Sequence, residues 1–308
     1  MRRLAPLLLA LALAPASCGE DEGAAPTTAA PEPGQASPAR PAADLDAFVA
    51  APTVEGLLAL LGQSHRAARE ALGPHRIQST ADLALRPPGD LPRPIVDGPA
   101  PAPQVVHDDL LLVWAGKDDR DLRLHLRQGP DEAGARELVI IGEDVHTRLP
   151  YRTFLRRELD SDVHWLWLDD AFHHVHDLVE LAAPSLVVSL AGDADGLVHV
   201  ELTRSESADP TRVATGLGRE WRAAAAITAI EGTLDLDRRA GIWRRADLRV
   251  AYTTKDAAGN LLQGEARLHA ELTPDPALTV EAPARSAALP TRPRYDDERR
   301  HLLDGLAR

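Results

Sequence analysis

The sequence predicts an α+β protein built on one large curved antiparallel sheet, with N-terminal helices and one mid-chain helix. Apolar and polar residues alternate with period two in about ten or eleven segments, as expected for half-buried strands. Helical spacing is confined to the start of the folded part and to one later segment. Most strand segments follow one another directly, which favours antiparallel order. We expect a twisted sheet of this size to curl so that its apolar face is buried.

The N-terminal helices are predicted within residues 44–72. Apolar side chains there are spaced for one helical face, and Pro52 interrupts it, so the segment forms two helices or one helix with a break. Gly73 and Pro74 end the helical pattern, and alternation over residues 75–85 predicts the first strand.

The middle of the chain predicts further strands and a single helix. The expected strands are 110–114, 122–126, 137–141, 145–149, 163–168, 186–190 and 197–202. The helix is expected over 169–181, with Asp169 or Asp170 as N-cap, and residues 192–196 are expected to form a hairpin turn. Adjacent acids at 108–109, 118–119 and 296–297 are interpreted as solvated loop ends.

The clearest element is a long hairpin within residues 247–272. Its two alternating runs flank a turn at 256–260, and a second turn at 238–241 links it to a strand over 233–237. Small residues in the apolar set either let a helix pack closely or leave a cavity. We predict that this face lines a ligand cavity, through Leu248, Val250, Tyr252, Leu262, Ala266, Leu268 and Leu272.

Composition and motifs exclude several classes of function. The formal charge is −13, with 47 acids against 34 Lys and Arg, so nucleic-acid binding is not expected. No nucleophile elbow, phosphate loop or dinucleotide fingerprint is present, and we predict neither an enzyme nor a cofactor. A single cysteine excludes an internal disulfide framework.

The histidine-rich run 173–176 is the densest polar group. On a helix His173, His176 and Asp177 share a face, which suits zinc, but His173, His174 and His176 must point in different directions. We predict an ordinary polar helix face and no metal site, leaving open whether the cluster is functional.

The amino terminus predicts export and a lipid anchor. Residues 1–17 combine two arginines with a short apolar core, the pattern of a secretory signal. The junction before Cys18 resembles the lipobox of bacterial lipoproteins, although Pro15 departs from it and ordinary cleavage nearby is the alternative. The resemblance implies that Cys18 is acylated with palmitate-type chains and holds the protein at the membrane, more at the periplasmic face of the outer membrane than at the inner membrane.

Domain boundaries follow from composition. Residues 18–43 are an Ala- and Pro-rich disordered tether, and 44–281 form a single β-rich domain. Within it, the Pro-rich segment 86–104 is a loop, interpreted as disorder or surface decoration, with a lid or a functional insertion as the alternative. Residues 282–308 form a C-terminal tail.

Helices first, then a long antiparallel meander with a mid-chain helix behind a signal, resemble the superfamily of outer-membrane lipoprotein carriers and receptors. The resemblance covers roughly residues 44–274 and includes the strand around 247–252. It implies an incomplete β-barrel whose concave apolar face, covered by helices, holds a lipid or a lipoprotein acyl chain. The alternative is a surface lipoprotein that acts as a protein-interaction or structural module.

Overall fold

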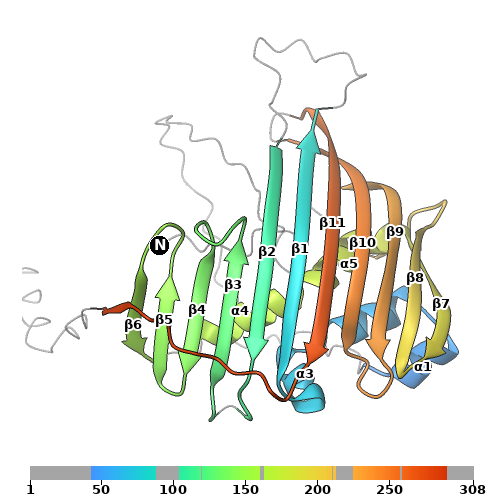
Figure 1. The fold of residues 1–308 in the computed structure, drawn as a ribbon. Coiled ribbons are helices and arrows are strands. Elements are labelled where there is room, and N and C mark those ends of the chain that lie inside the picture. The colour runs from blue at the N-terminus through green and yellow to red at the C-terminus, as the bar shows by residue number, and fades with distance from the viewer. Residues whose placement is uncertain are drawn as a thin grey trace, which may run out of the picture.

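The protein is an open, mostly antiparallel sheet of twelve strands with a few helices, seen in a computed structural model that describes residues 43–87, 104–118, 120–159, 163–209, 211–212, 225–256 and 259–289. The strands are β1 (His75–Arg86), β2 (Gln104–Trp114), β3 (Arg123–Gly129), β4 (Arg136–Ile141), β5 (Asp144–Arg148), β6 (Phe154–Glu158), β7 (Leu186–Ala194), β8 (Leu197–Arg204), β9 (Ala226–Asp237), β10 (Trp243–Lys255), β11 (Leu261–Pro274) and β12 (Ser286–Ala288). Their order is β12-β6-β5-β4-β3-β2-β1-β11-β10-β9-β8-β7 (Figure 1). Because β12 and β7 lie at opposite edges, the sheet does not close on itself.

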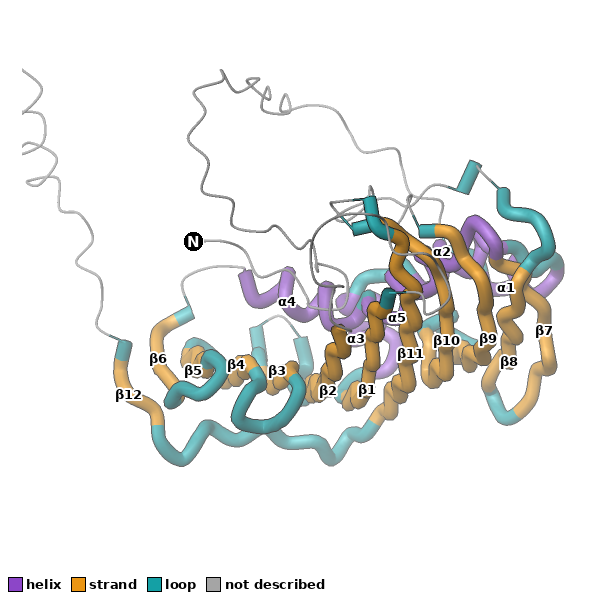
Figure 2. The backbone as a smooth tube through the Cα atoms, turned by 90° about the horizontal axis from the view of Figure 1, so that it is seen from above, coloured by secondary structure: helices purple, strands orange, loops and turns teal. Residues whose placement is uncertain are grey.

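The helices lie on one face of this sheet, here called the inner face (Figure 2). They are α1 (Leu45–Ala50), α2 (Val54–Leu61), α3 (His65–Leu72), α4 (Val163–Phe172), α5 (His174–Ala182) and a short 3₁₀ turn, η1 (Ala183–Ser185). Helix α2 contacts β7, α4 contacts β2, and α5 contacts β10 and β11. Two segments far apart in sequence therefore cover the apolar side of the sheet.

The N-terminal segment forms three short helices, more than the two predicted. Asp44, Thr53 and Ser64 each accept a hydrogen bond from a backbone N–H three residues later, at 2.9, 3.0 and 3.3 Å. Each is an N-cap that satisfies a free donor of the first turn, so the chain restarts a helix at each of these positions.

The mid-chain segment corrects two predictions. Residues 163–168 were expected to be a strand but begin helix α4, and the expected single helix is two, because α4 ends at Phe172 and α5 starts at His174. Side chains at His164, Leu168 and Phe172 are all buried. Their spacing of four residues is the helical period, so burial follows one helix face rather than alternate positions.

The hairpin prediction is confirmed. Strands β10 and β11 pair in register with Leu248 opposite Leu268, Val250 opposite Ala266 and Tyr252 opposite Gly264. A turn does lie within the predicted 192–196, but it is shorter: Asp195 and Gly196 adopt positive φ between β7 and β8, whereas residues 192–194 belong to β7. Two successive residues with positive φ make a tight turn whose twist matches antiparallel strands.

The chain after β11 crosses the sheet on the side away from the helices to reach β12 (Figures 1 and 2). Strand β12 then pairs with β6 in the only parallel contact of the described sheet, so part of the predicted tail 282–308 belongs to the sheet. The predicted signal, Cys18 and tether lie outside the described residues, as does most of the Pro-rich segment 86–104.

Candidate functional site

The predicted lining residues lie together on the inner face of β10 and β11. All seven are buried, from Tyr252 at 1% exposure to Leu262 at 9%. Directly paired residues of an antiparallel ladder point to the same side, so the register places them on one apolar surface. All of them except Leu262 belong to a core cluster that also includes Leu181 of α5 and Leu57 of α2. The apolar face of β10 and β11 is therefore covered by helices.

Tyr252 and Gly264 make the closest approach on this face. A Cβ atom built on Gly264 would lie 2.2 Å from two ring carbons of Tyr252. The absence of a side chain at Gly264 thus lets the ring lie flat on the neighbouring strand, an arrangement known from aromatic residues beside glycines in sheets. Burial raises the pKa of the Tyr252 phenol far above its ordinary value. The space that a side chain at Gly264 would take is therefore occupied by the Tyr252 ring.

One end of the inner face carries a buried polar atom. Thr254 is 3% exposed, and its hydroxyl finds no hydrogen-bond partner in the part of the chain that the structure describes. It lies opposite Leu262, next to the turn that joins β10 and β11. Because a buried hydroxyl without a partner is unfavourable, this end of an otherwise apolar surface suits a polar group from elsewhere.

A chain of polar side chains crosses the inner face under α4. Gln128 donates from Nε2 to Asp108 Oδ2 at 2.6 Å and accepts at Oε1 from Arg136 Nη2 at 2.6 Å. Burial raises the pKa of Asp108 and lowers that of Arg136. Asp108 was interpreted as a solvated loop end, which is wrong: it is 5% exposed inside β2. Asp108 and Leu110 are two residues apart and therefore point to the same side of β2, so the alternation could have predicted that Asp108 is buried.

A buried histidine pair joins α3 to the sheet. His75 Nδ1 lies 2.8 Å from the carbonyl oxygen of Gly73, so it carries the proton and donates. Neutral His75 then has a bare Nε2, to which His65 Nε2 donates at 3.1 Å. Burial lowers the pKa of His75 to about 4 and lowers that of His65 well below its ordinary value. Both rings are held neutral at pH 7.

The histidines of the run 173–176 point in different directions, as predicted. His173 Nε2 donates to the carbonyl oxygen of Gln63 at 2.9 Å, whereas His174 Nδ1 donates to that of Ala171 at 2.6 Å. Burial lowers the pKa of His174 to about 4. His174 also packs edge-on against Trp243, with ring centroids 5.5 Å apart. The absence of a zinc site built from these three histidines stays a prediction.

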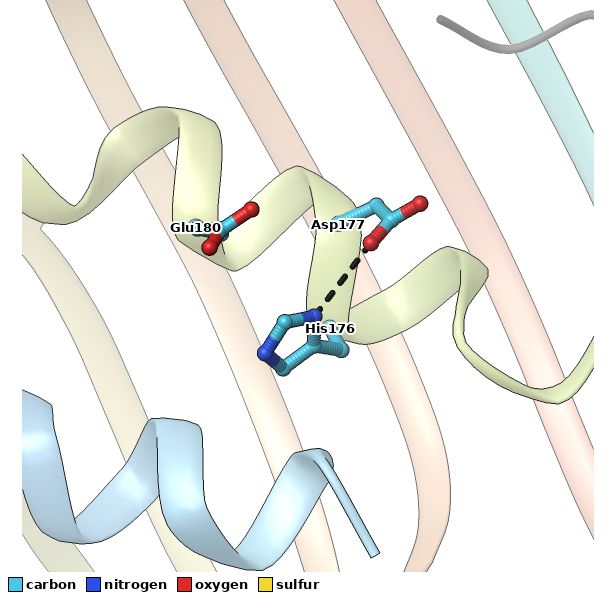
Figure 3. Close-up of side chains that lie close together, drawn as sticks. All are labelled: His176, Asp177 and Glu180. Atoms are coloured by element: carbon cyan, nitrogen blue, oxygen red, sulfur yellow. Dashed lines mark hydrogen bonds and ion pairs between the residues drawn. The ribbon is translucent and has the colours of Figure 1, made fainter. Parts of the chain in front are cut away.

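A different group on α5 brings possible metal ligands together. One ligand atom each from His176, Asp177 and Glu180 lies within 4.8 Å of the others (Figure 3). His176 Nδ1 and Asp177 Oδ1 are 3.3 Å apart, and Glu180 is buried. All three come from adjacent turns of one helix, and the sequence reasoning did not include Glu180. The i, i+4 spacing of His176 and Glu180 could have found it.

The outer face, away from the helices, is polar and hollowed. A groove of about 790 Å³ runs over β8, β9, β10, β11 and β1. Cross-strand pairs cover this face: His107 Nδ1 donates to Asp82 at 2.8 Å, His199 Nδ1 to Asp235 at 2.7 Å, and His269 Nδ1 to Asp247. The carboxylates on Asp82 and Asp109 raise the pKa of His107. These pairs depend on strand register, which period-two patterns alone do not give.

Searches of known protein families and of curated proteins found no match to this chain. Within the described ranges, none of the helices has the length and hydropathy needed to cross a bilayer.

Proposed function

We propose that this chain is a lipid-anchored protein of the bacterial envelope that binds an acyl chain between the concave inner face of a half-barrel and its helices. The observation that carries the proposal is the apolar surface of β10 and β11: all seven predicted lining residues lie on one side of these strands, and α5 contacts both strands. In this proposal the helices form a cover that opens for the ligand. It assigns no catalysis and no cofactor, and it agrees with the resemblance to lipoprotein carriers and receptors.

The energetics support an acyl ligand without a polar motif. Burying each CH₂ contributes about 0.8 kcal/mol, so an eight-carbon stretch supplies roughly 6 kcal/mol before ordering costs. The buried hydroxyl of Thr254 offers a hydrogen bond at one end of the surface. An amphiphile with its polar group near Thr254 and its chain along Tyr252 and Ala266 satisfies both features.

The test is a tryptophan at position 266. Ala266 lies between Leu83 on β1 and Val250 on β10, so Ala266→Trp fills the proposed site. We expect saturable uptake of a fluorescent fatty acid by the delipidated full chain, at least about tenfold weaker uptake by the variant, and nearly equal melting temperatures. A tenfold loss corresponds to about 1.4 kcal/mol of binding free energy.

The matched control is Arg267→Trp, one residue along β11 on the outer face, where the side chain is exposed. It should bind the fatty acid like the wild type. No saturable uptake by the wild type, together with an Ala266→Trp variant that merely melts early, would contradict the proposal, because a solid core is destabilised by overpacking.

A second candidate function is a non-catalytic interaction module. Tyr252 lying on Gly264 favours it, because that contact fills space on the inner face. The outer groove of about 790 Å³, lined by charges such as Asp82, Glu231 and Arg249, offers a polar surface for a protein partner. The same fatty-acid experiment separates the two, since this candidate predicts no uptake.

The anchor is proposed at Cys18, with the mature protein held at the envelope, at the periplasmic face of the outer membrane. Cells that express the wild type in labelled palmitate should incorporate the label into the protein, and Cys18→Ala should lose essentially all of it, because the thiol is the acylation site. The comparison needs equal amounts of both proteins on immunoblots. Equal labelling of the two would rule out the anchor.

A further inference from the structure

Helix α3 is attached to the rest of the protein over a small area. It packs at the end of the sheet where β1 begins (Figure 1), and among its eight residues only His65 and Ala68 are buried. Ala67 and Leu72 touch the core while remaining half-exposed. Because α3 buries little apolar surface, it belongs to the elements that open at a lower free-energy cost than the whole fold.

A contact between two histidine rings ties α3 to the strand that follows it. His65 is the first residue of α3 and His75 the first of β1, and their Nε2 atoms lie 3.1 Å apart. Both rings are buried, and the His65 ring also packs against Trp114 and Phe172. The contact needs a bare nitrogen on His75, because a proton on its Nε2 would set two N–H groups against each other. It is therefore lost when His75 becomes charged.

Most of the groups that face the pair oppose a positive charge on it. Two are cations, Arg69 of α3 and Arg244 of β10, and His173, between α4 and α5, is a third titratable neighbour. Among the described residues, the acid in contact with the pair is Asp169 of α4, whose Oδ1 accepts from the backbone N–H of His65 at 3.0 Å. His65 also starts α3, and the N-terminal end of a helix dipole disfavours a cation. A proton on either ring is thus accommodated only when α3 moves away.

We infer that α3 is an acid-released latch: as the pH falls, the His65–His75 pair takes up protons and α3 opens while the sheet stays folded. In the closed form burial lowers the pKa of His75 to about 4, whereas an exposed ring binds a proton near pH 6.5. The closed form is therefore fully favoured above pH 6.5 and loses this advantage on the way down to pH 4. This motion does not require the acyl-chain site.

Opening of α3 uncovers one end of the inner face. Helix α3 contacts α4, and α4 contacts β2. Arg69 lies between Trp114 and Trp165, with its guanidinium carbon 4.5 and 4.4 Å from the two ring centres. When α3 leaves, both indoles lose this cover and become accessible to water. Tryptophan fluorescence should therefore shift to longer wavelengths at pH 5 and return on going back to pH 7.

Amide hydrogen exchange of the full chain measures the opening. The probes are the amides of residues 69–73, such as Gly73 N–H, which donates to the carbonyl oxygen of Arg69 at 2.9 Å. Their protection factors are compared at pH 7 and pH 5, so that the intrinsic pH dependence of exchange cancels. One ring whose pKa rises from about 4 to 6.5 on opening makes the open form about twentyfold more populated at pH 5. We expect the protection of α3 to fall at least about twentyfold, while β10 and β11 stay better protected than α3.

Two variants that do not titrate test the cause. His65→Gln can still donate from its amide to His75, and His75→Asn can still donate to Gly73, but neither new side chain takes up a proton. In each variant the pH-dependent loss of protection should be about twentyfold smaller than in the wild type, whatever the protection at pH 7. Because only this ratio is compared, a variant with weaker packing remains informative.

The matched control is His199→Gln on β8, which removes a histidine that pairs with Asp235 on the outer face. It should keep the wild-type pH dependence in α3. The same pH dependence in the wild type and in both variants of the pair would overturn the latch. So would α3 amides that are as well protected as those of β11 at pH 5.

Discussion

Lowering the pH from 7 to 5 is expected to remove about 4 kcal/mol of unfolding free energy through His75 and His174 alone. Both rings have a folded-state pKa of about 4, because burial disfavours the charged form, against 6.5 in the unfolded chain. The unfolded state therefore takes up protons first as the pH falls below 6.5. The stability that the neutral rings allow is present above that pH and is lost on the way down to 4, at roughly 2 kcal/mol for each ring at pH 5.

Urea denaturation at the two pH values measures the loss, and His174→Asn isolates one contribution. The Asn amide can replace Nδ1–H as donor to Ala171 but does not titrate, so the variant should lose about 2 kcal/mol less on acidification. His107→Asn is the control: Asp82 raises the pKa of His107, so its contribution has the opposite sign and its removal should not reduce the acid loss. An identical pH dependence of wild type and His174→Asn would contradict the prediction.

Gly264→Ala is expected to lower the unfolding free energy by about 3 kcal/mol, the upper range for overpacking a core. The added methyl would meet the Tyr252 ring at 2.2 Å, and both residues lie within strands that are paired on both sides of them, so the backbone cannot shift freely. Gly192→Ala in β7 is the control, because its Cβ would meet only a His199 ring carbon at 3.7 Å.

A double-mutant cycle tests the cause of this loss. In a Tyr252→Ala background the ring is gone, so Gly264→Ala should cost almost nothing, and the coupling should nearly equal the single-variant effect. The same cost in both backgrounds would mean that Gly264 is required for the backbone and not for the ring.

The sequence predicts the sheet well where alternation is long. The hairpin of β10 and β11 alternates over more than twenty residues, and no helix tolerates that pattern. In contrast, Trp165 and Trp167 alternate with their neighbours over only six residues. The helical spacing of His164, Leu168, Phe172 and Val175 covers the same segment and continues beyond it, and it is the pattern that burial follows.

The sites were less accessible to sequence reasoning. The seven predicted lining residues could be placed on one face because alternate residues of a strand point to the same side, and the sequence shows this alternation directly. The hydrogen bond from His173 to the carbonyl oxygen of Gln63 could not be found, because it depends on the packing of helices that are far apart in the sequence. Likewise, Asp108 and Gln128 meet only because β2 and β3 pair in a particular register.

The strand order has a consequence for how the chain is made. Strands β2 to β6 and β7 to β11 pair mostly with their neighbours in sequence, but β1 pairs with β11, so that Ile77 lies opposite Leu272. Strand β1 is synthesised first, but one of its two edges can pair only after β11, the last long strand, has been made. Until then its edge is an unpaired template on which another chain can add a strand, and contacts this distant form slowly. A nascent chain of this protein therefore needs protection along β1 more than at any other edge of the described sheet while it folds.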